Sequence, residues 1–405
     1  MTATVHCAPV VLTMTGPPIL DGAVLVENDR VAWVGERRDV PGARVREWPG
    51  VMTPGLVNAH AHLEYGPAFS HLASGGLPFA DWILQLGQVR SDFTDLEWQV
   101  QARGSAHQLL KSGTTAVADI VTRGPAIVVA GSLGLQGISY GELAGVDGAG
   151  WPVARQKLER ILATGGRERG VSPHTIYSLS SQVFRDMVAL ARSGGMRLHP
   201  HLAETADEAE WALTGTGPFQ EFAARFGFVF ELSGVGAGKS AVAHCADLGG
   251  LGADVHVAHG VHVDAPDRAL LREHGTVVAL CTCSNAVLQA GEAPVADYLS
   301  EGSPVAIGTD SLASVPDLDL LAEARATRDL VRRQGLEHPE EALVHALTLG
   351  GAQALGMDLG TLREGGRADL AVFDVPTDEP FRDLIEHGAG RCVATVVGGR
   401  LVHRR

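Results

Sequence analysis

The sequence predicts an α/β protein: a (β/α)8 TIM-type barrel with a small β-sandwich domain built from both chain ends. In the middle of the chain, apolar strand-like runs alternate with helical stretches, the pattern of a parallel sheet. Eight β-then-α units fit a closed barrel, whose active site lies at the C-terminal ends of its strands. The structural alternative is an open doubly wound sheet, which brings fewer strand ends around one point. The predicted strands are 56–62, 115–121, 137–143, 171–178, 196–201, 255–260, 276–281 and 304–310.

The two ends of the chain resemble each other and differ from the middle. Residues 22–35 have the pattern of a β-hairpin whose turn is Asn28-Asp29, and segments 368–373 and 393–402 also have strand character. We expect these ends to form one small sandwich; two unrelated edge hairpins are the alternative. The predicted domains are 1–52 with 368–405 for the sandwich and 53–367 for the barrel, and the predicted helices include 95–111, 153–163, 183–193, 205–214 and 266–273.

Composition and charge narrow the class of partner. With 45% apolar residues, a chain of 405 residues can bury a large core. A formal net charge of −15 argues against nucleic acid or an anionic membrane as the main partner. The expected partner, a small-molecule substrate, follows from the motifs described below. The first residues lack the basic region and apolar core of a secretory signal, and charges interrupt every apolar run. Five cysteines suit reduced thiols, so we expect a cytoplasmic protein, either a monomer or a homo-oligomer.

The strongest chemical signal is the pair His60 and His62 at the end of the first predicted strand. Side chains alternate along a strand, so both histidines project to the same side and can reach one ion. Neutral imidazole is a common zinc ligand. Such a pair also arises by chance, and a buried histidine bonded to backbone beside a surface histidine is the alternative.

The same spacing recurs at His199 and His201, with a carboxylate three residues further on at Glu204. If the strand ends near His201, that histidine can bind a metal while Glu204 shuttles a proton. The alternative for Glu204 is a carboxylate that only stabilises a helix N-terminus. Pro200 bends the chain between the two histidines, so His199 is assigned to packing or to support of the site.

Two further polar residues stand at later strand ends, His259 after the sixth and Asp310 after the eighth. A carboxylate in that position can bind a metal and accept a proton from water whose pKa the ion lowers. Each residue alone reads equally well as an ordinary strand-end polar group. Together with the histidines they favour a hydrolytic site that holds a single metal ion.

Two other motifs carry weaker signals. The Gly-rich segment 233–240 ends in a Gly-Lys-Ser sequence, but Ser233 stands where a phosphate-binding loop needs its first glycine. We interpret it as a flexible connection, and nucleotide hydrolysis is a remote alternative. Cys281 and Cys283 could form a soft-metal site, although two buried thiols on a strand are the favoured interpretation.

Seven segments resemble, in order, motifs of the amidohydrolase superfamily in its deaminase branch: PGLVNAHAHLEY, SGTTAVADI, SPHTIYSLS, HPHLAET, VAHGVHV, CTCSNAVL and GTDSLAS. The resemblance covers nearly the whole chain, including the closing segment LREGGRADL. It departs from the family at 281–285, where relatives often have Pro-Arg-Ser-Asn, and at 233–240, which is unusually long. Both departures concern the substrate pocket and leave the metal-binding motifs intact.

The resemblance implies a role for each residue of the site. Glu204 would be the proton shuttle, and His259 would hydrogen-bond the metal-bound hydroxide. Asp310 would accept the proton of the water as well as bind the ion. The implied ligands of one zinc ion, replaced by iron in some relatives, are His60, His62, His201 and Asp310.

The lysines bear on the number of metal ions. Binuclear hydrolases of this type commonly bridge their two ions with a carboxylated lysine after the fourth strand. None of the three lysines, Lys111, Lys157 and Lys239, lies at a predicted strand end. One divalent ion per chain is therefore expected.

The implied reaction is hydrolytic deamination of a 6-aminopurine nucleoside, in which Glu204 protonates the ring nitrogen beside the attacked carbon. Within the branch, the chain resembles the aminodeoxyfutalosine deaminases, which form futalosine and ammonia on a route to menaquinone. The alternatives are a deaminase of S-adenosylhomocysteine or methylthioadenosine, then of guanine or cytosine. An amide or chloride hydrolase would use the same metal, and a barrel retained as a non-catalytic scaffold is the non-enzymatic alternative.

Three residues are the implied substrate contacts. His174 resembles a histidine that contacts the nucleoside in adenosine-type members, Glu64 follows the first histidine pair, and Trp82 belongs to an expected pocket wall. Arg90 and Arg123 are candidates for the carboxyphenyl end of aminodeoxyfutalosine, although arginines are usually exposed.

Overall fold

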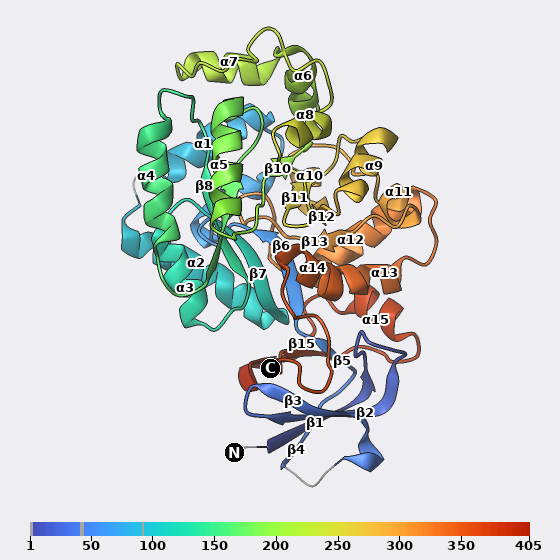
Figure 1. Ribbon diagram of the computed structural model, residues 1–405. Helices are drawn as coiled ribbons and strands as arrows, with labels where there is room; N and C mark the ends of the chain where they lie inside the picture. The colour runs from blue at the N-terminus through green and yellow to red at the C-terminus, as the bar shows by residue number, and fades with distance from the viewer. Residues whose placement is uncertain (1–2, 41–43, 91–92) are drawn as a thin grey trace.

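The computed structural model describes residues 3–40, 44–90 and 93–405. Figure 1 shows a large domain of strands and surrounding helices above a small β domain that contains both ends of the chain. Within the described residues, no helix is both long and apolar enough to cross a membrane.

Both chain ends build one sheet with the strand order β16-β15-β14-β5-β1-β2-β3, and β4 pairs with β1. Asn28 forms the turn of the predicted hairpin, with φ of 56°. Val24, from the N-terminal part of the chain, packs in one buried cluster with Val372 and Val396 from the C-terminal part. This confirms the predicted accessory β domain; its boundaries remain our proposal. The strands are β1 Ala3–Val11, β2 Ile19–Glu27, β3 Arg30–Glu36, β4 Arg44–Glu47, β5 Val51–Pro54, β14 Leu370–Phe373, β15 Cys392–Val397 and β16 Arg400–Arg404.

The large domain contains two parallel four-stranded sheets, β6-β7-β8-β9 and β10-β11-β12-β13. Bridges join them at both edges: Ala61 pairs with Asp310, and Leu198 pairs with Val171 and Val255. The eight strands follow the predicted order around a barrel. They are β6 Leu56–Ala61, β7 Thr114–Val121, β8 Ile138–Leu143, β9 Glu168–Pro173, β10 His201–Leu202, β11 His256–His259, β12 Val277–Leu280 and β13 Val305–Ile307.

The fifth strand is shorter than predicted, because β10 contains only His201–Leu202. Pro200 has no backbone N–H to give to a neighbouring strand, so regular pairing cannot run through it. Leu198 still bridges both neighbours, and His201 therefore begins the regular strand rather than ending it.

The predicted helices are present with small changes at their ends. In α5, apolar residues such as Phe184 and Met187 face the barrel and are fully buried, each stabilising the fold by about 1.5–3 kcal/mol. The helices are α1 Phe79–Arg90, α2 Asp95–Lys111, α3 Gly124–Ser132, α4 Trp151–Leu162, α5 Ser181–Ser193, α6 Ala206–Thr214, α7 Pro218–Arg225, α8 Ala241–Asp247, α9 Ala265–Glu273, α10 Thr282–Val287, α11 Val295–Ser300, α12 Leu320–Arg333, α13 Glu340–His345, α14 Gly351–Leu355 and α15 Pro380–His387, with short 3₁₀ segments at Arg37–Asp39 and Pro67–Ser74 and a π-helical turn at Ala346–Gly350.

The Gly-rich segment 233–240 connects α7 to α8 and has partners of its own. Ser240 caps α8, and the Lys239 ammonium lies 2.6 Å from the Asp247 carboxylate. No strand precedes the segment, since α7 and a series of turns lead into it. The backbone N–H groups of Ala237 and Gly238 also donate to carbonyls at the end of α6, so the segment joins the end of α6 to α8.

Candidate active site

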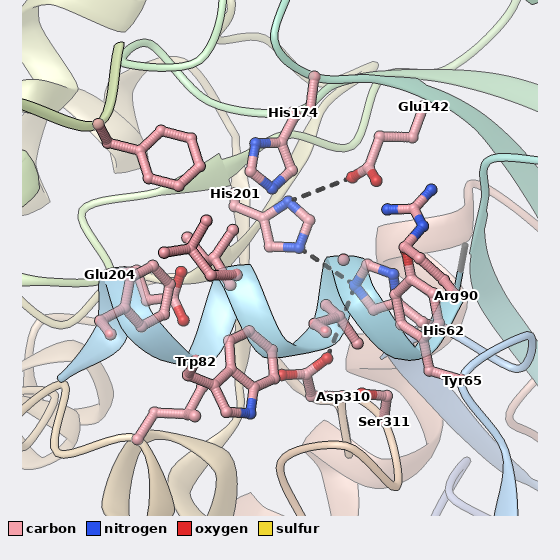
Figure 2. Close-up of a pocket in the computed structure, with 18 of the residues that line it drawn as sticks. His62, Tyr65, Trp82, Arg90, Glu142, His174, His201, Glu204, Asp310 and Ser311 are labelled. Carbon is pink, nitrogen blue, oxygen red and sulfur yellow. Dashed lines mark hydrogen bonds and ion pairs between the residues drawn. The ribbon is translucent and has the colours of Figure 1, made fainter. Parts of the chain in front are cut away.

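His60, His62, His201 and Asp310 converge at the carboxyl side of the barrel strands. His62 Nε2 lies 3.3 Å from His201 Nε2, and Asp310 Oδ1 lies 3.6 Å from His62 Nε2. His60 Nε2 is 3.7 Å from the same carboxylate oxygen. All four side chains are buried. Figure 2 shows His62, His201 and Asp310 pointing toward one another.

His199 fixes the orientation of His60. Its Nδ1 lies 2.9 Å from the His256 carbonyl oxygen, so Nδ1 donates and Nε2 is left to accept. That Nε2 lies 2.8 Å from His60 Nδ1, which must then donate. His60 Nε2 therefore carries a lone pair and faces the cluster, where it is buried without a hydrogen-bond partner among the described residues. His199 thus orients a member of the cluster in addition to packing.

The cluster fits a divalent metal ion. Ligand atoms of His60, His62 and His201 lie within 4.8 Å of one another, as do those of His60, His259 and Asp310. Burial lowers the pKa of His62 to about 4 and holds the pKa values of His60 and His201 well below the usual range, so the imidazoles stay neutral. The lone pair of His60 Nε2, buried without a hydrogen-bond partner among the described residues, is the group that a bound cation would satisfy. Zinc and iron both accept three imidazoles and a carboxylate.

Asp310 is held on one side so that the other side faces the histidines. The hydroxyls of Ser284 and Ser314 both donate to Asp310 Oδ2, at 2.7 and 2.9 Å. Asp310 also has a left-handed backbone with φ of 62°, and its N–H donates to the His60 carbonyl. Non-glycine residues persist in this conformation only where the surrounding structure enforces it.

His259 and Glu204 form a second pair beside the cluster. Asn285 Oδ1 lies 3.0 Å from His259 Nδ1, which therefore donates and leaves Nε2 toward Glu204 Oε1, 3.7 Å away. Burial, and then the charge of Asp310, raise the pKa of Glu204 well above its usual value. Glu204 precedes Thr205, which caps α6, and its own N–H donates to Glu208 Oε2. The carboxyl group is held in place and tends to stay protonated.

These groups line a cavity of about 720 Å³. Trp82 of α1 and His174 lie in its wall, as the sequence predicted for substrate contacts. The Trp82 Nε1–H donates to the Ala313 carbonyl, and His174 Nδ1 lies 2.8 Å from the Ser178 hydroxyl. In Figure 2, Trp82 and Glu204 lie on one side of Asp310 and Arg90 lies on the other.

Glu64 has a different position from the one expected. It is not among the described residues that line the cavity, and its carboxylate accepts hydrogen bonds from the Thr122 N–H and hydroxyl. The same hydroxyl accepts from Arg90, which lines the cavity. Arg123 lies 5.3 Å from the centre of the Trp98 ring and, like Glu64, is absent from the described lining.

Neither Glu142 nor the hydrogen-bond partners of Asp310 and His259 were predicted from the sequence. Glu142 is the penultimate residue of β8 and lies in the cavity wall, with a carboxylate oxygen 3.8 Å from His201 Nδ1. Burial raises the pKa of Glu142 to about 8. Its place at a strand end was the signal that could have found it. Ser284 and Asn285 lie in the motif that also contains Cys281 and Cys283, and in that motif only the two thiols suggested a metal site. Among the described residues, neither cysteine belongs to a candidate metal group.

Comparisons with known proteins agree with this geometry. The chain matches the amidohydrolase family over residues 51–402. A 5-methylthioadenosine/S-adenosylhomocysteine deaminase of Natronomonas pharaonis is 32% identical over 411 residues, which cover 94% of this chain and 86% of that protein.

Two solved structures share the fold at low sequence identity. The aminofutalosine deaminase of Helicobacter pylori superposes with a TM-score of 0.83 at 19% identity, over 99% of this chain and 100% of that one. A zinc-bound adenosine deaminase of Xanthomonas campestris gives 0.81 at 22% identity, over 99% and 92%. These likenesses confirm the predicted fold class. The family match over residues 51–402, together with the deaminase relative at 32% identity, shows that the chain belongs to the amidohydrolase family and is a hydrolase of carbon–nitrogen bonds.

Proposed function

We propose that this amidohydrolase is a metal-dependent deaminase that releases ammonia from a 6-aminopurine nucleoside. The observation that carries the proposal is Glu204, a buried carboxyl group with a raised pKa beside the ligand cluster. Deamination of a ring amidine needs a proton donor for the ring nitrogen, which amide or chloride hydrolysis needs less. The deaminase relative at 32% identity supports the same reaction class.

A zinc ion bound by the three histidines and Asp310 would supply Lewis acidity and lower the pKa of a water molecule toward neutrality. The chain's own residues then move the protons. Asp310 uses Oδ1 to accept a proton from the attacking water, because Ser284 and Ser314 occupy Oδ2. His259, held by Asn285, presents Nε2 to the same water.

Glu204 acts on the purine side of the reaction. Its carboxyl group donates a proton to the ring nitrogen next to the amino-bearing carbon, and a carboxyl with a raised pKa carries that proton near neutral pH. Water then adds to the carbon, and the amino group takes up the proton accepted by Asp310 and leaves as ammonia. The remaining hydroxyl proton of the adduct returns to Glu204 as the 6-oxo group forms. The product is the 6-oxopurine nucleoside.

For the substrate we propose aminodeoxyfutalosine first, converted to futalosine in menaquinone synthesis. A second cavity, which shares His174 with the catalytic cavity, supports a nucleoside with a bulky extension. The second candidate is methylthioadenosine or S-adenosylhomocysteine, and the named activity of the relative at 32% identity favours it.

A panel assay tests the proposal. Zinc-loaded protein is mixed with aminodeoxyfutalosine, S-adenosylhomocysteine, methylthioadenosine, adenosine, guanine and cytosine. Ammonia release and the ultraviolet change from adenine to hypoxanthine are followed. We expect turnover of the 6-aminopurine nucleosides, with aminodeoxyfutalosine preferred. Absence of ammonia from every compound, with zinc bound, would overturn the deaminase assignment.

A further inference from the structure

A second cavity of about 210 Å³ adjoins the catalytic cavity. The two share four lining residues, Ile83, Ala144, His174 and Phe222, so they meet next to the histidine expected to contact the nucleoside. We call the second cavity the aromatic annex, because besides Phe222 it is lined by the rings of Tyr177, Phe219, Phe228 and Phe230. Ala223 also lines it.

The rings of the annex are fixed by contacts with one another. Tyr177 and Phe219 stack with ring centres 3.7 Å apart and planes at 4°, and Phe228 stacks on Phe230 at 5.7 Å. Phe219 of α7 also meets Phe79 of α1 edge to face. The annex is therefore pre-formed, which lowers the entropic cost of binding a ligand.

Size and polarity indicate what the annex can hold. An apolar cavity of roughly 150 Å³ is large enough for a benzene ring, so about 210 Å³ accommodates an aromatic ring with a small substituent. No acidic side chain is found among the described residues that line it. An amino-acid tail would bury its ammonium group there without a partner, which is costly.

Arg225 supplies a positive charge close to the annex. It is the last residue of α7 and lines the catalytic cavity one turn after Phe222, which borders both cavities. Its side chain is exposed, and no hydrogen bond or ion pair joins it to another described residue. A guanidinium in this state can bind a carboxylate of the ligand with two parallel hydrogen bonds.

Arg90 does not serve the same purpose, although it also lines the catalytic cavity. Its guanidinium donates to the Thr122 hydroxyl and lies 5.6 Å from the centre of the Tyr65 ring. The carboxylates of Glu64 and Glu142 act on it as well. Its charge is already compensated inside the protein, so Arg225 is the better partner for a ligand carboxylate.

We propose that the aromatic annex and Arg225 form a subsite for a carboxylated aromatic ring attached to the sugar of the nucleoside. The substrate class is then purine nucleosides that carry an aryl carboxylate. The inference rests on the proposed function, because the purine must occupy the catalytic cavity for the ring to reach the annex.

Binding of reaction products tests the subsite without turnover. Calorimetry on zinc-loaded protein compares inosine with the same nucleoside carrying a 5′-linked carboxyphenyl group, and with its neutral carboxamide analogue. We expect the carboxyphenyl nucleoside to bind at least about tenfold more tightly than inosine. Equal binding of these two nucleosides would overturn the inference.

Arg225→Gln examines the charge. The carboxyphenyl nucleoside should bind about threefold more weakly, as for an exposed ion pair, whereas inosine and the carboxamide should bind as before. Arg160→Gln, an exposed arginine of α4, is the matched control and should change none of the three. Full selectivity for the carboxylate in Arg225→Gln would contradict the assignment of that residue.

Ala223→Leu examines the annex itself by placing three more carbon atoms in it. We expect roughly a tenfold loss for both aryl nucleosides and none for inosine. If the Ala223→Leu variant does not fold, the exposed Arg225→Gln variant and the comparison of nucleosides on the wild-type protein still test whether the subsite binds the carboxyphenyl group. Ammonia release is scored separately: selective binding without deamination would refute the proposed function alone, and deamination without selectivity would refute the subsite alone.

Discussion

The carboxyl ends of the barrel strands and the wall formed by α1 and α7 hold their side chains in different ways. At the strand ends, hydrogen bonds hold key side chains in place, as His199 holds His60 and Asn285 holds His259. In the α1 and α7 wall, apolar and aromatic side chains pack on one another, and Arg225 extends into the opening without a described partner. One region is built from hydrogen bonds and the other from packing.

This difference assigns the reaction chemistry to the strand ends and the choice of substrate to the wall formed by α1 and α7. Hydrogen bonds to one defined atom fix the orientation of a ligand or proton donor, and small errors in orientation slow the reaction strongly. Packed rings define a volume, and a change of volume alters which molecules fit. Substitutions at the strand ends should therefore change metal content or kcat, and substitutions in the wall should change KM.

The largest effect is expected from His201→Ala. It removes one of the imidazoles that converge on the metal site and leaves His62 without its nearest neighbour. Zinc content measured by mass spectrometry should fall close to zero, and kcat/KM should drop at least about a thousandfold. His274→Ala, an exposed histidine, is the control and should keep both zinc and activity. Full zinc content in His201→Ala would remove that residue from the ligand set.

Glu204→Gln should be nearly as severe but should spare the metal. The amide keeps the shape of the side chain and cannot donate an acidic proton, so kcat should fall roughly 10²- to 10⁴-fold while zinc content stays unchanged. Burial raises the pKa of Glu204, so its protonated form is lost as the pH rises through that higher value. Wild-type kcat should therefore decline on the alkaline side. Substantial activity in the variant would exclude Glu204 as proton shuttle.

The metal-binding side chains at the strand ends were predictable from the sequence, whereas of the α1 and α7 wall only Trp82 was predicted. Histidines two residues apart on a strand share a side whatever the rest of the fold does, so His60 and His62 followed from local geometry alone. Glu64 stands two residues after them, but the regular strand ends at Ala61 and the carboxylate turns to Thr122 instead. Only the fold brings Arg225 to the cavity, because no local pattern marks it.

Asn285→Ala should have an intermediate effect. It removes the acceptor for His259 Nδ1–H, so the ring loses its fixed tautomer and the aim of Nε2 toward Glu204. Loss of such supporting groups typically costs 10- to 100-fold, and we expect a loss of roughly this size in kcat with zinc retained. Cys283→Ala in the same short helix is the matched control. If kcat of Asn285→Ala stayed at the wild-type value, His259 would not need support from Asn285.

Trp82→Phe, in the wall, should have the smallest effect and the most informative pattern. Phenylalanine keeps an aromatic surface toward the cavity but loses the hydrogen bond from Nε1 to the Ala313 carbonyl. One such bond contributes about 0.5–1.5 kcal/mol, so a rise in KM of about two- to tenfold is expected while kcat changes less than about twofold. Steady-state kinetics on the preferred nucleoside measure both. If kcat fell instead, α1 would position the reacting groups as well as enclose the substrate, and the division between chemistry at the strand ends and selectivity in the wall would fail.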